Sequence, residues 1–475
     1  MTNIDKIVDA FRLGTFEIDC TSMALRQRKE GGPRYEGPGY VRQVEGGALE
    51  FKLYVEKKEN ARLPAILERL TGGASGGLYS DGDLYDLTAI SVDGTCWEAA
   101  RIVEPRSNWN MQNDTGVLSG GLQSIHAGPM LPPMGSPFLR LHFFEEFELP
   151  LNSWSPDPDH PLQGLARDHA QLQSCGATFE VRSRVGSGDT VVTVTAEAPF
   201  PAAFDLRIQE ALQYVTGRSP IWRARVENSM GMTVLELASP RPQAASTHFD
   251  PPISPASIDF HHHTWALFDR FLCYVVEKTD TTSGDRHWNS VAYHLYMARE
   301  STAASLDAWA VGVSVAVEAL TSLTELAGET DREDSWAGFR RRVLEWLEKQ
   351  TDIAEGTKKR AQGLIGGSAN KGAKQVLREL AENDRIDRRY VAAWDKLRNG
   401  RVHPNLVDLR LPGAGDYREL YKRLQQVGVL LHQLTFHLIG YEGPFTDYGG
   451  DAHGSRRYPL MESEEGESGA SRNPS

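Results

Sequence analysis

The spacing of apolar residues changes once along this chain of 475 residues, and this change limits the folds that the chain can adopt. Up to about residue 250, apolar and polar residues alternate, as in 48–55 and 138–144, which is the pattern of half-buried strands. Beyond residue 257, apolar residues recur every three or four positions, as in 301–327, which is typical of amphipathic helices. Five prolines lie between the two regions, namely Pro240, Pro242, Pro251, Pro252 and Pro255. The sequence therefore predicts a domain boundary near residues 240–257.

Residues 1–250 are expected to form an antiparallel, sandwich-like β-domain. The alternating segment 177–185 and the β-branched segment 190–196 indicate two strands, and the turn residues 186–189 between them predict a hairpin. A short helix is expected at 204–214.

Residues 258–445 are expected to form a helical bundle. Apolar stripes predict helices over 265–278, 301–327, 336–346, 371–382, 387–398 and 416–439. The stripe of the third of these helices consists of Trp336, Phe339, Val343 and Trp346. In the fifth helix, Tyr390, Trp394 and Leu397 lie on one side. The segment 447–475 is rich in Gly, Ser, Glu and Asn, and it is expected to be disordered. The predicted fold class is α+β.

Composition and charge narrow the function. The N-terminus has no signal-peptide pattern, and no run of about 18 apolar residues is available to span a membrane, so we expect a cytoplasmic protein without a membrane partner. The formal charge of −13 argues against a protein covered by nucleic acid along its length. Residues 335–410 nevertheless hold 17 Lys and Arg against 10 Asp and Glu. This local surplus would suit a phosphate-binding site, although a solvated helical face gives the same pattern.

The segment 397–403, Leu-Arg-Asn-Gly-Arg-Val-His, lies within this basic region. Arg398 offers a planar fork of donors for phosphate oxygens, and His403 supplies an imidazole, a group suited to moving protons near neutral pH. Gly400 is expected to end the preceding helix, and Pro404 to prevent its continuation, so that Arg398 and His403 approach each other. A C-capping Arg and a helix-start His that only satisfy backbone groups are the structural alternative.

The pattern Leu-Arg-Asn-x-x-x-His, between one helix and a final long amphipathic helix, resembles the signature of the HEPN superfamily (higher eukaryotes and prokaryotes nucleotide-binding). This resemblance covers residues 258–445. The β-rich front half, with the stretch 209–218, further resembles the architecture of ApeA-type anti-phage HEPN nucleases. An Arg-x4-His spacing alone should arise about once by chance in such a chain, and an Asn after the Arg lowers this expectation to roughly 0.05.

The resemblance implies a metal-independent endoribonuclease that needs no cofactor. His403 would act as general base or acid when a ribose 2′-OH attacks the adjacent phosphodiester. Arg398 would stabilise the charge on the phosphate, and Asn399 would orient a catalytic group or the substrate. Glu318, a polar residue on the apolar helix 301–327, would hold Arg398 in place or else face solvent.

Two further residues of the motif region, Arg401 and Lys396, would contact RNA or serve only as surface residues. The basic runs 340–342 and 358–360 would follow a nucleic-acid backbone or form a solvated face. The run His261-His-His263 lacks an accompanying Cys or carboxylate cluster, so no metal is expected there. The resemblance also implies a homodimer whose two motifs form one composite site.

The sequence thus favours an anti-phage defence ribonuclease of the abortive-infection type. Its front domain would hold the nuclease latent until a phage-derived trigger is sensed, and tRNA is one candidate substrate. The alternative is a non-catalytic HEPN module that binds nucleotide or dimerises within a toxin or defence complex. A sugar-processing front domain is a third hypothesis, but no convincing pair of carboxylates supports it.

Overall fold

The computed structural model of this chain describes most of its residues: 3–60, 79–103, 105–110, 115–130, 136–151, 168–184, 188–229, 231–241, 249–279, 287–324, 329–367, 372–401, 414–450 and 453–460. The chain divides into two compact units. The first, which we call the sheet unit, comprises Met1–Phe147, Leu151–Asp205 and Pro220–Gln243. The second, the helical unit, comprises Glu148–Pro150, Leu206–Ser219 and Ala244–Ser475.

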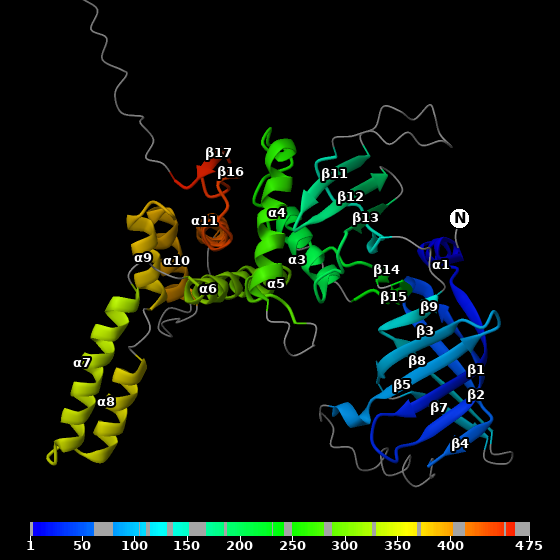
Figure 1. Cartoon of the computed structure of the whole chain (residues 1–475). Coiled ribbons are helices and arrows are strands. Elements are labelled where there is room, and N and C mark those ends of the chain that lie inside the picture. The colour runs from blue at the N-terminus through cyan, green and yellow to red at the C-terminus, as the bar shows by residue number, and fades with distance from the viewer. Residues whose placement is uncertain are drawn as a thin grey trace, which may run out of the picture. The chain divides into compact units, whose positions relative to one another are not determined.

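One fifteen-stranded antiparallel sheet forms most of the sheet unit (Figure 1). Its strands are β1 (Glu17–Gln27), β2 (Arg34–Gln43), β3 (Leu49–Val55), β4 (Lys57–Glu59), β5 (Tyr85–Ser91), β6 (Cys96–Ile102), β7 (Arg106–Asn110), β8 (Thr115–Leu122), β9 (Ser124–Met130), β10 (Phe138–Phe143), β11 (His169–Ser174), β12 (Ala177–Arg184), β13 (Asp189–Thr195), β14 (Ala224–Ser229) and β15 (Met232–Ala238). Their order is β11-β12-β13-β10-β14-β15-β9-β6-β5-β1-β2-β3-β8-β7, and β4 pairs with β2.

The antiparallel character predicted for the front region is confirmed. Along β3, the apolar residues Leu49, Phe51, Leu53 and Val55 are buried in turn, as the alternating pattern requires. Strands β12 and β13 form the predicted hairpin, in which Arg184 lies opposite Asp189. Hydrogen bonds link the fifteen described strands of this unit into a single sheet, so the prediction of a sandwich with two separate sheets is wrong for these strands. Alternation shows which face of a strand is buried, but it does not identify the neighbouring strand.

The unpredicted helix α1 (Asn3–Arg12) completes the sheet unit. It buries Val8 and Phe11 in the core that the sheet residues form. The ring of Phe11 packs edge-on against Phe16 at 5.8 Å between centroids, a favoured aromatic geometry. The helix therefore covers part of the apolar surface of the sheet.

The helical unit contains nine described helices and one two-stranded sheet (Figure 1). They are α3 (Phe204–Thr216), α4 (Phe260–Lys278), α5 (Ser290–Ser301), α6 (Leu306–Ser322), α7 (Glu329–Lys349), α8 (Glu355–Gly367), α9 (Ala373–Glu382), α10 (Arg388–Arg401), α11 (Ala414–Ile439), β16 (Gly443–Thr446) and β17 (Ser455–Tyr458). Each of the six predicted helices has a counterpart, whereas α5 and α8 were not predicted. The predicted helix at 204–214 is α3, and from Leu206 onward it belongs to the helical unit.

The prediction that disorder begins at residue 447 is wrong as far as Leu460. Strands β16 and β17 pair, and Tyr458 is buried. The hydroxyl of Tyr390 on α10 donates a hydrogen bond to the carboxylate of Asp447. Arg456 Nη1 lies 2.9 Å from a carboxylate oxygen of Asp387 and 3.0 Å from one of Asp447. These charged groups, partly withdrawn from water, attach the end of the chain to the start of α10. Residues 461–475 lie outside the described residues.

Replacing Arg456 by methionine is expected to destabilise the helical unit by about 1.5–3 kcal/mol, because hydrogen bonds to charged groups have this value. The change leaves the carboxylates of Asp387 and Asp447 without their shared cation. Urea unfolding followed by ellipticity at 222 nm measures the loss. Arg457→Met is the matched control, since Arg457 is exposed on the same strand. Equal stability of the two variants would contradict the role given to Arg456.

Candidate functional site

The predicted catalytic motif begins on α10, which extends further than expected. The helix continues through Gly400 to Arg401, and Gly400 does not adopt the left-handed conformation of a glycine that follows a helix end. The prediction that Gly400 breaks the helix is therefore wrong. Glycine in a helix costs about 1 kcal/mol relative to alanine, and packing elsewhere on α10 outweighs this cost. His403 lies outside the described residues, so its approach to Arg398 stays a prediction.

Buried side chains fix the position of α10 against α6, α9 and α11. Tyr390, Trp394 and Leu397 lie on one face of the helix and are all buried, as the sequence predicts. The indole Nε1 of Trp394 donates a hydrogen bond to the carbonyl oxygen of Ser314 on α6, at 3.5 Å. Because Trp394 precedes Arg398 by one turn, this anchor places Arg398 close to α6.

Arg398 is paired with Glu318, a residue 80 positions earlier in the chain, on α6. The Nε of Arg398 donates a hydrogen bond to Oε1 of Glu318, and its guanidinium carbon lies 5.8 Å from the centre of the Trp394 ring. The two charged side chains are 33% and 38% exposed, respectively. Glu318 was predicted either to hold Arg398 or to face solvent, and in the structure it holds Arg398.

This pairing leaves most of the guanidinium available. An arginine has five N–H donors, and in the described part of the chain only the Nε–H of Arg398 has an acceptor. The four donors on the terminal nitrogens form the fork that binds phosphate oxygens in a bidentate manner. Glu318 therefore orients the side chain without occupying its phosphate-binding edge, although its negative charge opposes the binding of an anion.

Asn399 is exposed next to Arg398. Its Nδ2 lies 3.4 Å from Oδ1 of Asp395, a long and therefore weak hydrogen bond. The other oxygen of Asp395 accepts a hydrogen bond from Lys374 Nζ on α9, at 2.7 Å. The amide of Asn399 is thus accessible to a ligand.

The two supporting basic residues differ in their placement. Lys396 is exposed, but it lies about 200° around the helix from Arg398, so the structure does not bring it to the Arg398–Glu318 pair. Arg401 is three positions beyond Arg398, about 60° away around the axis, and its side chain lies outside the described residues.

The run of three histidines lies at the start of α4. His261 and His262 are exposed, and His263 is half-buried. In the described ranges, no group of three or more His, Cys, Asp or Glu side chains is arranged to hold a metal ion.

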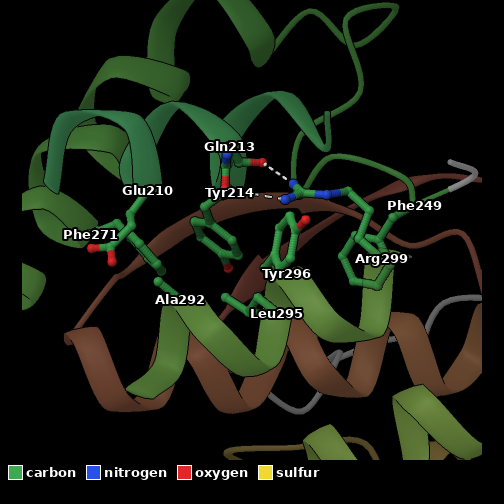
Figure 2. Close-up of a pocket in the computed structure, with 9 residues that line it drawn as sticks. All are labelled: Glu210, Gln213, Tyr214, Phe249, Phe271, Ala292, Leu295, Tyr296 and Arg299. Atoms are coloured by element: carbon green, nitrogen blue, oxygen red, sulfur yellow. Dashed lines mark hydrogen bonds between the residues drawn. The ribbon is translucent and has the colours of Figure 1, made fainter. Parts of the chain in front are cut away.

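A buried polar cluster, which sequence reasoning missed, lies at a pocket of the helical unit (Figure 2). Glu210 and Gln213 of α3 and Arg299 of α5 line this pocket, and Arg207 lies next to Glu210. Arg299 of α5 donates hydrogen bonds to the backbone oxygen of Gln213 at 3.0 Å and to its side-chain oxygen at 3.2 Å. Burial lowers the pKa of Arg299 to about 10. Burial also raises the pKa of Glu210 to about 7, despite the adjacent Arg207 and the N–H of Asn289.

The pocket has room for about one water molecule, too little for a nucleotide. We therefore assign the cluster a structural role. Its sequence signal is the placement of Arg207, Glu210 and Gln213 at intervals of three, on one face of α3. The stretch 209–218, which carries the looser resemblance, contributes Glu210 and Gln213 to this network.

Comparison of this chain with family models, curated proteins and solved structures found no match. Among the helices that the structure describes, none combines the length and the apolar composition needed to cross a membrane.

Proposed function

We propose that this protein is a metal-independent endoribonuclease of the HEPN type. The observation that carries the proposal is the state of Arg398, which Glu318 orients through Nε while the terminal nitrogens stay available to a phosphate. The accessible amide of Asn399 beside it supplies a second polar group for the same substrate.

The proposed reaction is an internal transesterification. His403 removes the proton of a ribose 2′-OH, the 2′-oxygen bonds to phosphorus, and the bond from phosphorus to the 5′-oxygen breaks. The departing 5′-oxygen takes a proton, either from the imidazolium of His403 or from that of a second copy. The products are a 2′,3′-cyclic phosphate and a 5′-hydroxyl. Arg398 stabilises the added charge on the phosphate oxygens.

We further propose that two copies of the chain form one composite site, since each copy supplies a single Arg398. An exposed apolar stripe on α6 supports this proposal. Val311 and Val315 are 40% and 49% exposed and lie on the same face of the helix as Glu318. Exposed valines at helical spacing, on the same face as the Glu318 that holds Arg398, suit a contact with a second copy.

In the proposed biological role, the enzyme is a cytoplasmic anti-phage nuclease of the abortive-infection type. The sheet unit restrains it until a phage-derived trigger binds. A candidate substrate is tRNA.

Cleavage of RNA in EDTA tests the proposal. We expect the purified protein, mixed with extract of phage-infected cells to supply a trigger, to cut total RNA into fragments that end in 2′,3′-cyclic phosphate. RNA that stays intact in this mixture, together with normal growth of cells that overproduce the protein, would refute it. The non-catalytic alternative predicts this outcome with a dimer still present.

Replacing Glu318 by glutamine is expected to lower cleavage about tenfold, because Arg398 loses its ionic partner and its fixed orientation. The stability of the fold should change by less than about 1 kcal/mol, since a partly exposed ion pair contributes little. The initial rate of cleavage and the urea midpoint provide the two measurements. An unchanged rate would mean that Glu318 does not position Arg398 for catalysis.

A further inference from the structure

The exposed face of α7 carries an alternating stripe of aromatic and basic side chains. Phe339, Arg342, Trp346 and Lys349 follow one another at intervals of three or four residues, so they lie within about 80° of arc on the helix. Phe339 is 49% and Trp346 56% exposed, and both basic residues are exposed as well. We call these four residues the α7 stripe.

Helices α7 and α8 pack mainly against one another in the part of the chain that the structure describes, and Figure 1 shows them side by side. On α7, Leu347 is buried, whereas its neighbours Trp346 and Glu348 are exposed. The helix therefore has one buried, apolar side. The stripe lies away from Leu347 around the helix. Helix α8 adds the basic run Lys358-Lys359-Arg360, of which the last two are exposed.

We infer that the α7 stripe is a docking surface for single-stranded RNA. An exposed Trp offers a face on which an unpaired base stacks, and cations one turn away reach the flanking phosphates. Among the described residues, no carboxylate forms an ion pair with Arg342 or Lys349, so their charges are available to an anion. Glu348 lies outside the stripe, and Glu345 borders it, one turn from Arg342 and Lys349, without forming an ion pair with either.

Charge favours RNA over a second copy of the chain as the occupant. Two copies that met stripe to stripe would bring the cations of one against those of the other, which opposes association. An RNA strand instead supplies bases that can stack on the aromatic side chains of the stripe, and phosphates that can pair with its cations. This inference rests on the proposed ribonuclease function and specifies how the substrate is held: as an unpaired segment of RNA.

Fluorescence anisotropy with a 5′-fluorescein-labelled single-stranded 20-mer RNA of mixed sequence tests the inference. The full chain with His403→Ala is used, so that the probe is not cut. In this background, Trp346→Ala is expected to weaken binding about tenfold and to leave the salt dependence unchanged, because stacking releases no counterions. Arg342→Gln combined with Lys349→Gln should reduce the slope of log K against log salt by about 1.4, at about 0.7 per phosphate contact on single strands.

Arg341→Gln is the matched control. Arg341 is exposed on the same helix but outside the stripe, so its loss should leave RNA affinity nearly unchanged. If Arg341→Gln reduced the salt slope by about 0.7, as much as is expected for each stripe cation, the result would indicate an unspecific positive field and overturn the inference. The inference would also be overturned if the stripe variants bound RNA with wild-type affinity. A third contrary outcome is that Trp346→Ala changes the oligomeric mass of the protein but not its affinity for RNA.

Cleavage assays separate this inference from the proposed function. If the stripe variants cut RNA normally while Arg398→Ala is inactive, the inference fails and the nuclease assignment stands. If the stripe binds RNA but the wild-type protein never cuts it, the nuclease assignment fails and the docking surface stands.

Discussion

Alanine at Arg398 or His403 is expected to abolish RNA cleavage and growth arrest while the fold persists. Loss of a positioned proton-transfer group typically lowers the reaction rate by a factor of about 10²–10⁴. Loss of one donor to a developing oxyanion lowers it by about 10²–10³. Both variants should therefore fall below detection in an end-point assay. The stability effect is small for Arg398, because its ion pair with Glu318 is partly exposed.

The measurement is the initial rate of cleavage of triggered protein in EDTA, together with colony counts on overproduction. Arg378→Ala is the control, since Arg378 is an exposed arginine on the neighbouring helix α9. Its activity should match the wild type. If Arg398→Ala and His403→Ala both cut RNA at the wild-type rate, the catalytic assignment is wrong. If both variants still arrest growth without cutting RNA, the toxicity comes from a non-catalytic interaction.

Local periodicity predicted the anchoring of the site well. The spacing of Tyr390, Trp394 and Leu397 placed them on one face of a helix, and all three are buried. This succeeds because helical spacing depends on neighbours within two turns. Gly400 shows the limit of the same reasoning. Glycine has only a weak preference for helix ends, and tertiary packing outweighs this preference.

Periodicity cannot show whether an apolar face has a partner. The spacing of Phe339, Val343 and Trp346 correctly predicted a helix, but Phe339 and Trp346 are largely exposed while Val343 is half-buried. An apolar stripe indicates which residues lie together on a helix, and the packing of that face depends on segments far away in the sequence.

Long-range polar contacts are the hardest to predict. Glu318 was a candidate partner of Arg398 because it interrupts an apolar helix and because the family resemblance implies an acidic residue there. The two residues are 80 positions apart in the chain, so no local pattern connects them. The contacts of Arg456 with Asp387 and Asp447 were missed because disorder was predicted from the average composition of segment 447–475. Within that segment, Ser455–Tyr458 forms strand β17, which contains Arg456 and Tyr458.

Removing one member of the buried pair of Arg207 and Glu210 is expected to destabilise the helical unit strongly. Their side chains are 2% and 0% exposed, and Arg207 Nη1 lies 3.0 Å from Oε2 of Glu210. Arg207 also donates hydrogen bonds to Thr279, at the end of α4, at 2.7 Å and to the backbone oxygen of His287. Glu210 accepts a hydrogen bond from the N–H of Asn289, the N-cap of α5, at 2.9 Å. The pair therefore joins α3 to the ends of α4 and α5.

Arg207→Met should destabilise the helical unit by about 3–5 kcal/mol at pH 8, the cost of leaving one member of a buried ion pair alone. The loss should be smaller at pH 6, where Glu210 can take up a proton. Burial already raises the pKa of Glu210 to about 7 in the folded state, above its ordinary value of 4.5. Between pH 4.5 and pH 7, Glu210 holds a proton in the folded state but has lost it in the unfolded state. The contribution of Glu210 to stability therefore decreases as the pH rises toward 7.

Urea unfolding followed at 222 nm separates these effects, because nearly all described helices belong to the helical unit. Arg207→Met combined with Glu210→Gln should recover part of the stability at pH 8, since no buried charge is then left alone, and its stability should vary less between pH 5 and pH 7. Arg378→Met, an exposed change of the same type, should cost less than about 0.5 kcal/mol. A double variant no more stable than Arg207→Met at pH 8 would show that lost packing, and not an unpaired carboxylate, accounts for the destabilisation.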